Sequence, residues 1–493
     1  MHENHGPGRV RETSGAMASH GAASHRAATT RERRFGRESR ALLRLAGPII
    51  LSQVAQVMVG VLDTVMSGHA GAMQQAVVGI GVALWIPVFI SLMSVVQAVS
   101  PVIAHDFGAG DRDGVVRHAR EGLWLAGFIG LVPLALLPWA PALLAQAGIA
   151  ADLAQRAGVF LWGIGLGLPA ALVYRSLSFY SASINQTAPV MVLSFVTLGV
   201  NALLNWVLIN GHFGLPAMGG AGCGWATGIG MWIGLIAMIV WTRCAAVYKP
   251  YFLWRAWTGP TWAMQRRLLR IGLPMGAAGF AEVAAFSSIA VLVGRFGEVQ
   301  IAAHQIALNF SALAFMLPMG IASALTIRVG QSLGAGDPRA ARYIAWHGIS
   351  VGLMIAAAMI GPILLLREQV ATVYSSDPAV QLLAGNLLLF AAFWQLFDAT
   401  QVCAIGALRG YKITVMPMVL MLIAFWAVGV PSGTWLAYHG IGGKPMKVYG
   451  FWVGLVIGLV LVSAALVVGL RKVANAALAG RGHAAMPSSM PRG

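Results

Sequence analysis

Three acidic residues lie deep inside long apolar stretches of the sequence, and they are the side chains best placed to do chemistry. Asp63, Glu282 and Asp398 each have no Lys, Arg, Asp or Glu within ten positions on either side. An ionised carboxylate at the centre of a bilayer costs about 2.5–3.5 kcal/mol on insertion scales, so such a residue is functional by default. Competition between a proton or Na⁺ and a cationic substrate for one carboxylate is the minimum chemistry of an antiporter. We expect Asp63, Glu282 and Asp398 to couple transport to ions, with Glu282 and Asp398 as the ligands for Na⁺; the alternative for each is a hydrogen bond to a neighbouring helix and no further role.

Polar side chains accompany the acids at helical spacing. Gln56 lies two turns before Asp63, and Trp394 lies one turn before Asp398, so each pair shares a helical face. Polar residues in other apolar stretches either line a cavity with the acids or bond to a neighbouring helix, and the sequence leaves both open. These further candidates for substrate or cation binding are Asn201, Asn205, Thr227, Gln305 and Asn309.

The elements that must position these residues are membrane-spanning helices. Of the 493 residues, 58% are hydrophobic and only 10% are charged, whereas a soluble protein carries about a quarter charged residues. Apolar stretches of about 20 residues are long enough to cross the roughly 30 Å hydrocarbon core. We therefore predict an all-α integral membrane protein with twelve transmembrane helices. The predicted spans are 41–66, 75–105, 120–145, 156–182, 187–210, 221–243, 270–296, 302–332, 343–366, 378–408, 413–438 and 447–471.

The net charge of +17 is explained by topology rather than by nucleic-acid binding. If both termini are cytoplasmic, nearly all Lys and Arg residues fall on the inner side, as the positive-inside rule requires. We expect a multi-pass protein of a bacterial-type plasma (inner) membrane that acts as a monomer in the lipid bilayer. Residues 1–40 and 473–493 are expected to be disordered tails. Only these five basic residues fall outside the pattern: Arg156, Arg295, Arg367, Lys444 and Lys447.

The second half of the sequence repeats the first. Pro48 and Pro274 are 226 residues apart, and the motif GAGD occurs at 108–111 and again at 334–337, with the same offset. Such spacing indicates an internal duplication. We predict an N-lobe over 41–243, a basic cytoplasmic connector over 244–269 and a C-lobe over 270–472. Two six-helix halves share one orientation and place a central cavity between them at the membrane midplane. The GAGD segments are predicted to be tight turns between helices.

Three longer motifs are specific enough to compare with known families: VGVLDTVMSGHAG at 59–71, AAHQIALNFSALAFMLPMGIASALTIRVGQSLGAGD at 302–337 and QLFDATQVCAIGALRGY at 395–411. They resemble the multidrug and toxic compound extrusion (MATE) family, in its NorM-like branch. The resemblance implies a two-lobed efflux antiporter that exports cationic drugs and dyes in exchange for Na⁺ or H⁺, with no cofactor. One departure is Trp394, where the family pattern implies a Tyr. The residues that match the family's polar clusters are Gln56, Asp63, Asn201, Asn205 and Thr227 in the N-lobe and Glu282, Gln305 and Asp398 in the C-lobe.

Three other functions compete with this interpretation. A major-facilitator proton antiporter also has two six-helix halves, and GAGDRDGVVRHAR loosely fits its signature turn. A flippase of the wider MATE-related superfamily would need basic residues at mid-membrane for pyrophosphate, and only Arg175 is a candidate. An integral-membrane enzyme would need a metal cluster or nucleophile, yet His304 and His347 are isolated in the sequence. No Walker A motif occurs, so we expect no direct use of ATP.

Overall fold

The computed structural model describes residues 11–255 and 257–480, with side chains from Phe35 onward, and consists almost entirely of helices. Each of the twelve predicted spans coincides with one helix, or a run of consecutive helices, that is long and apolar enough to cross a bilayer. All twelve are therefore confirmed.

The N-lobe helices are α1 (Arg11–His69), α2 (Ala72–Val96), α3 (Val99–Gly108), α4 (Arg112–Leu131), η1 (Val132–Trp139), α5 (Ala140–Gln146), α6 (Ala151–Ser183), α7 (Ala188–Asn210), η2 (His212–Gly214) and α8 (Gly220–Cys244). After η3 (Ala246–Tyr251), the C-lobe helices are α9 (Trp262–Gly294), α10 (Glu298–Gly334), α11 (Pro338–Tyr374), α12 (Pro378–Gly410), α13 (Val415–Leu422), η4 (Ile423–Gly429), α14 (Val430–Tyr438) and α15 (Val448–Leu478).

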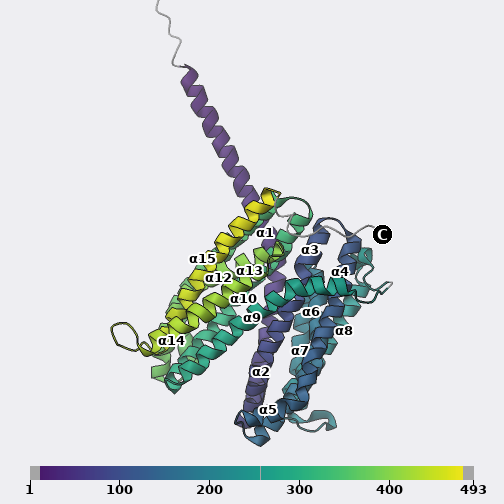
Figure 1. The fold of residues 1–493 in the computed structure, drawn as a ribbon, viewed down its shortest axis with the longest axis vertical. Coiled ribbons are helices and arrows are strands. Elements are labelled where there is room, and N and C mark those ends of the chain that lie inside the picture. Colours follow the sequence, from purple (N-terminus) through teal and green to yellow (C-terminus); the bar gives the residue numbers. More distant parts are fainter. Residues whose placement is uncertain (1–10, 256, 481–493) are drawn as a thin grey trace, which may run out of the picture.

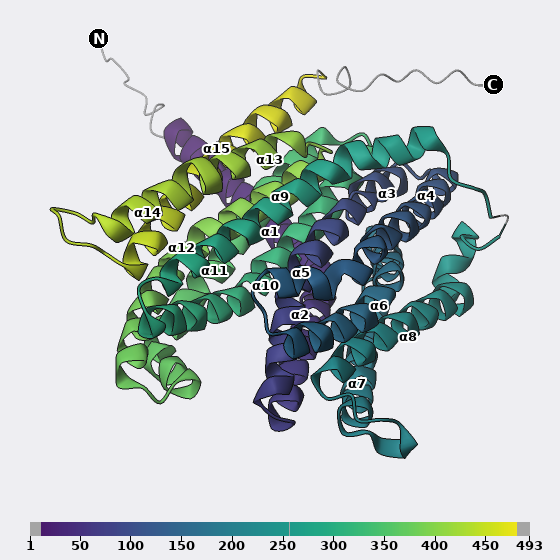
Figure 2. The same ribbon diagram turned by 60° about the horizontal axis from the view of Figure 1, so that its bottom comes forward.

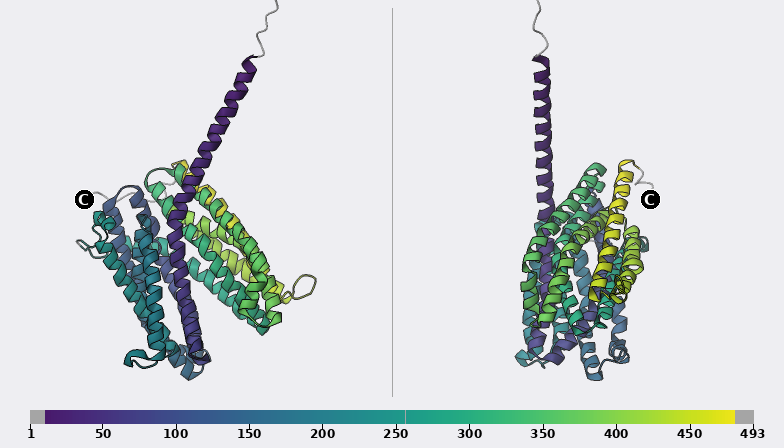
Figure 3. Two further views of the ribbon diagram at one scale, coloured as in Figure 1. Left: turned by 180° about the vertical axis from the view of Figure 1, so that it is seen from behind. Right: turned by 90° about the vertical axis from the view of Figure 1, so that its left-hand side faces the viewer.

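The two ends of the chain differ from the expected disordered tails. Helix α1 begins at Arg11 and projects from the helix bundle (Figure 3), while α15 continues to Leu478. Residues 11–47 contain no proline and many good helix formers, which favours continuation of the first span. The remainder of the expected tails, residues 1–10 and 481–493, lies outside the described residues.

The first helix of each lobe crosses to the other lobe. The part of α1 before Pro48 contributes Leu42 and Leu45 to the hydrophobic core of the C-lobe. The equivalent part of α9, before Pro274, packs Leu268 against N-lobe residues of α3 and α4. Figure 2 shows α9 passing from beside α3 and α4 to the C-lobe helices. Because both helices cross, the lobes are joined by α1 and α9 as well as by direct contact.

The two GAGD segments are tight turns, as predicted. Gly110 and Gly336 adopt left-handed backbone angles, with φ of 73° and 74°, which glycine reaches without steric cost. The next residue then caps the following helix: the Asp111 carboxylate accepts from the Gly114 N–H at 2.8 Å, and the Asp337 carboxylate accepts from the Ala340 N–H at 2.9 Å. These aspartates thus have a structural role that accounts for the motif.

The lobes contact one another near these turns and diverge toward the opposite end (Figure 1). At the α3–α10 crossing, Gly108 lies against the backbone of Gln331 and Gly334 against the backbone of His105. The two contacts are related by the 226-residue offset, since 108 + 226 = 334 and 105 + 226 = 331. We call this region of inter-lobe packing the closed layer. By the predicted topology it lies on the cytoplasmic side.

Candidate functional site

The C-lobe brings two of the predicted acids together. Glu282 lies in α9 and Asp398 in α12, and the rings of Phe286 and Trp394, each one turn from one of the acids, lie 5.6 Å apart. Asp398 is only 5% exposed, and Glu282 is partly buried. Among the side chains that the structure describes, no Lys, Arg or His nitrogen lies within 4.0 Å of either carboxylate. Two carboxyl groups therefore lie in an apolar environment, and no ion pair joins either of them to a basic side chain within the described residues.

Arg409 is the basic residue that acts on Glu282 electrostatically. Its guanidinium donates instead to the side-chain oxygen of Gln97 in the N-lobe, at 3.0 Å. Sequence spacing does not predict this inter-lobe hydrogen bond, because Gln97 lies more than 300 positions from Arg409 in the chain. Arg409 is therefore bonded to the N-lobe and, among the described residues, forms no ion pair with Glu282 or Asp398.

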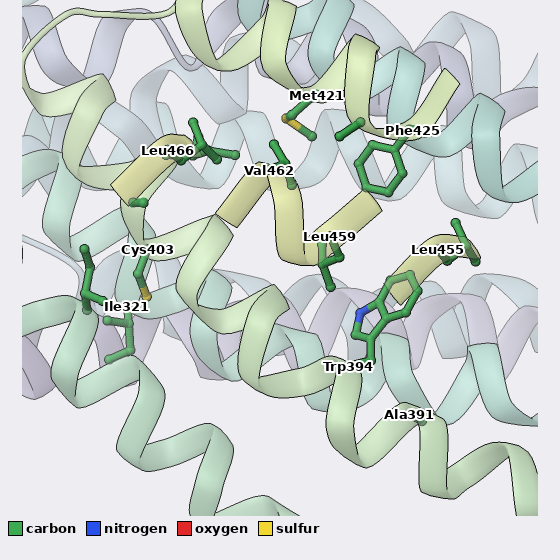
Figure 4. Close-up of a cluster of buried hydrophobic side chains, with 14 of the residues drawn as sticks. Ile321, Ala391, Trp394, Cys403, Met421, Phe425, Leu455, Leu459, Val462 and Leu466 are labelled. Carbon is green, nitrogen blue, oxygen red and sulfur yellow. The ribbon is translucent and has the colours of Figure 1, made fainter. Parts of the chain in front are cut away.

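Aromatic side chains enclose the acidic pair. Trp394 lies one turn before Asp398 in α12, and its ring lies 5.6 Å from that of Phe286 and 5.8 Å from that of Trp452. Figure 4 shows Trp394 among the packed side chains of the C-lobe core. One turn from Asp398, the Gln401 side-chain oxygen is buried without a hydrogen-bond partner. Carboxylate and amide oxygens of this kind suit a hard cation, which is consistent with the predicted Na⁺ ligands.

The third predicted acid, Asp63, lies in the N-lobe, and each of its carboxylate oxygens accepts a hydrogen bond. The Asp63 carboxylate accepts from the Asn205 amide at 2.6 Å and from the Thr227 hydroxyl at 3.2 Å. Asn201 donates to Thr227 and accepts from Asn205, each at 3.0 Å. Four of the predicted N-lobe residues, from α1, α7 and α8, therefore form one network, and their side chains bond between helices as well as to the acid.

Gln56 has a different partner from the one that helical spacing suggested. Its side-chain oxygen accepts a hydrogen bond from the Arg175 guanidinium of α6, and no hydrogen bond joins it to Asp63 among the described residues. The two-turn separation from Asp63 lets Gln56 reach a different neighbouring helix. Arg175 lies in α6 eight positions before the helix ends at Ser183.

Among the described residues, neither of the two candidates on α10 makes a hydrogen bond to the acidic pair. Gln305 and Asn309 are both exposed, whereas the adjacent His304 is fully buried and accepts from the Trp452 indole at 3.2 Å. Exposure leaves Gln305 and Asn309 facing lipid or the region between the lobes. No group of three or more His, Cys, Asp or Glu side chains is arranged to hold a metal within the described part of the chain.

The sequence profile of the MatE family matches residues 48–207 and 274–435, two segments that begin 226 residues apart (274 − 48). Multidrug resistance protein PmpM of Pseudomonas aeruginosa is 42% identical, covering 86% of this chain and 90% of the relative. The probable multidrug resistance protein NorM of Chromobacterium violaceum is 40% identical, covering 86% and 91%.

Solved structures share the fold at lower identity. The eukaryotic MATE transporter AtDTX14 superimposes with a TM-score of 0.81 at 20% identity, covering 91% of this chain and 99% of that one. An outward-facing multidrug resistance MATE transporter superimposes with a TM-score of 0.80 at 19% identity, covering 89% and 96%.

Proposed function

Because this chain belongs to the MatE family, whose members are transporters and not enzymes, we propose that it is a multidrug efflux antiporter that exports cationic lipophilic compounds in exchange for Na⁺ or H⁺. Relatives named as multidrug resistance proteins cover most of the chain, which supports small-molecule drugs as substrates. Family membership also removes the major-facilitator and enzyme alternatives.

The main support for the exchange mechanism is that neither Glu282 nor Asp398 has an ion-pair partner among the described residues. Their mutual repulsion in an apolar environment favours uptake of a positive charge, because a bound cation or proton offsets the cost of burying negative charge. A cationic drug and the coupling ion would each satisfy the pair, so binding of one displaces the other. The aromatic groups Phe286 and Trp394 beside the acids offer contact area for flat, lipophilic cations.

The arrangement of the lobes supports alternating access around this pair. The lobes are packed together at the closed layer, and their helices diverge toward the other end (Figure 1), which supports a substrate path between the lobes that opens on the side opposite the closed layer. With both termini cytoplasmic in a bacterial-type inner membrane, this is the outward-facing state of a monomer. Exchange requires the closed layer to open after drug release and ion binding.

Purified protein in proteoliposomes tests the proposal. We expect an imposed Na⁺ or pH gradient, applied separately and without ATP, to drive movement of a cationic dye, and Asp398→Asn to reduce the initial rate at least tenfold. Asp152→Asn is the matched control, because Asp152 is exposed and pairs only with Arg156. Undiminished gradient-driven transport by Asp398→Asn at wild-type protein levels would remove the acidic pair from the mechanism.

A further inference from the structure

Two glutamines at equivalent positions of the repeats have different surroundings. Gln74 in the first turn of α2 and Gln300 in the first turn of α10 are 226 residues apart, and each donates its N–H to the carbonyl three residues earlier, at 3.0 and 3.2 Å. In the N-lobe, the Gln74 side-chain oxygen accepts from the Gly220 N–H at 2.8 Å and so caps the start of α8. In the C-lobe, the Gln300 side-chain oxygen is buried and has no hydrogen-bond partner, which is costly unless a donor reaches it.

The residue before the capped helix explains this difference. Gly219 before α8 and Lys447 before α15 are structurally equivalent, because each N–H donates to the carbonyl ten residues earlier, at 3.2 and 3.1 Å. Their backbone angles also agree, with φ and ψ of 57° and −138° against 49° and −130°. A Cβ added at Gly219 would lie 2.3 Å from the Gln74 side-chain oxygen. Because Lys447 has a Cβ, Gln300 cannot cap α15 as Gln74 caps α8.

Lys447 is unfavourable at its position unless its side chain is used. Its φ of 49° lies in a region that residues with a Cβ rarely adopt, and such strain is concentrated at functional sites. By the predicted topology, Lys447 is also one of the few basic residues on the outer side. Of these, Arg156 and Arg367 pair with acids, whereas among the described residues no carboxylate oxygen lies within 4.0 Å of the Lys447 amine. Its positive charge is therefore available to a ligand.

A cavity of about 350 Å³ lies beside the lysine and the unpaired glutamine. The Tyr449 ring lies 5.9 Å from the Phe390 ring, and the Tyr449 hydroxyl accepts from the Asn386 amide at 3.3 Å. Aromatic and apolar groups thus form the walls, while one ammonium and one free acceptor supply the polar contacts. This combination of size and lining is typical of a ligand site. The residues that line the cavity are Gln300, Phe390, Pro445, Met446, Lys447 and Tyr449.

We propose that this cavity binds the headgroup of a phospholipid from the outer leaflet. The phosphate would contact Lys447 and the start of α15, since a helix N-terminus and an ammonium both favour a phosphate. The free oxygen of Gln300 would accept from an N–H or O–H of the headgroup, which phosphatidylethanolamine supplies and phosphatidylcholine lacks. Helices α10 and α15 both begin here, so the cavity lies where a membrane-spanning pair meets the headgroup region, and its apolar walls suit a lipid better than a free phosphate. The site does not depend on the proposed drug exchange.

Native mass spectrometry of the delipidated full chain in detergent tests the assignment. The probes are phosphatidylethanolamine, phosphatidylcholine and diacylglycerol with the same acyl chains, and inorganic phosphate. We expect phosphatidylethanolamine to bind about tenfold tighter than either of the other lipids, because each lacks one charge-assisted hydrogen bond. Inorganic phosphate at the same concentration should not displace it. Gln300→Ala should abolish the preference for phosphatidylethanolamine over phosphatidylcholine.

Substitution of the lysine separates binding from folding. Lys447→Gly recreates the N-lobe arrangement, so it should weaken phosphatidylethanolamine binding about tenfold or more and raise the melting temperature of the lipid-free protein. Lys447→Met keeps the Cβ, and it should weaken binding equally without that rise. Lys444→Met is the matched control, because Lys444 is exposed in the same loop and does not line the cavity; it should change neither quantity.

Four results would overturn the proposal. Unchanged phosphatidylethanolamine binding in both Lys447 variants would show that the lysine touches no lipid. A lower melting temperature of Lys447→Gly, with equal loss of all three lipids, would show that Lys447 only supports the fold. Equal binding of phosphatidylethanolamine and phosphatidylcholine by the wild-type protein would remove Gln300 from the site. Displacement of the lipid by inorganic phosphate would indicate a site for small anions instead.

Discussion

The glycine pair at the α3–α10 crossing allows the conformational exchange to be perturbed without touching the acids. A Cβ added at Gly108 would lie 2.7 Å from the Gln331 Cα, and one added at Gly334 would lie 2.8 Å from the carbonyl carbon of His105. Carbon atoms in contact normally lie about 3.5–4.0 Å apart. Gly108→Ala therefore forces the two helix backbones apart by about 0.7 Å or more, because the opposing atoms are backbone and cannot rotate away.

This steric overlap destabilises only the conformation in which the closed layer is formed. Overpacking a tight contact typically costs about 1–3 kcal/mol, and the contact exists only while the closed layer is formed. Since about 1.4 kcal/mol changes a population ratio tenfold, Gly108→Ala should shift the equilibrium about tenfold to a hundredfold toward states in which the cytoplasmic side is open. The double variant with Gly334→Ala should shift it further.

Spin-label distance measurements report this shift directly. Labels at Ala109 and Ala335, which follow the two glycines and are exposed, should show a longer inter-label distance in Gly108→Ala, in a background where Cys223, Cys244 and Cys403 are replaced. Gly127→Ala is the matched control, because nothing lies within 4 Å of a Cβ at that helical position. An unchanged distance distribution in Gly108→Ala would refute the idea that this crossing holds the lobes together.

Two further predictions concern stability. Asn205→Ala removes the 2.6 Å hydrogen bond to the buried Asp63 carboxylate and should lower the free energy of unfolding by about 1–3 kcal/mol. Thermal unfolding should show a lower melting temperature for Asn205→Ala than for the control variant Asn210→Ala, at an exposed position. Equal melting temperatures for the two variants would contradict the prediction. Burial, with Arg267 nearby, lowers the pKa of Lys412 from 10.5 to about 8, although Asp106 acts in the opposite direction. Below pH 8 the charged Lys412 therefore lowers the free energy of unfolding by at most about 3 kcal/mol. This destabilisation decreases as pH rises from 8 toward 10.5, because Lys412 loses its proton in the native state before it does so in the unfolded state. Lys412→Met should raise the melting temperature at pH 7 by more than at pH 10, and a pH-independent difference would contradict this assignment.

The spans, the repeat and the turns could be predicted from the sequence because each depends on a local pattern. Apolar length determines which stretches cross the membrane, and a fixed offset between prolines and GAGD motifs identifies the duplication. The turn geometry follows from Gly110 and Asp111, since a left-handed glycine followed by a capping aspartate acts within a few residues.

Partners across helices could not be predicted in the same way. Helical spacing put Gln56 and Asp63 on one face, but that face borders more than one helix, and Gln56 reaches Arg175 of α6. The same limit applies to Gln305, whose exposure depends on the rotation of α10 in the bundle. The link between Arg409 and Gln97 joins residues in different lobes, so no spacing within one stretch could indicate it.

The crossing of α1 also constrains how the protein is made. When a ribosome has completed only the first six spans, Leu42 and Leu45 are already in the membrane, but the side chains that bury them have yet to be synthesised. The inner half of the first helix must therefore wait in lipid until α10 and α11, which pack against it, are inserted, while the inner half of α9 meets an N-lobe that already exists. Helix α9 can therefore pack as soon as it is inserted, whereas the inner half of α1 packs only later. The two repeats are similar in architecture but not equivalent during biogenesis.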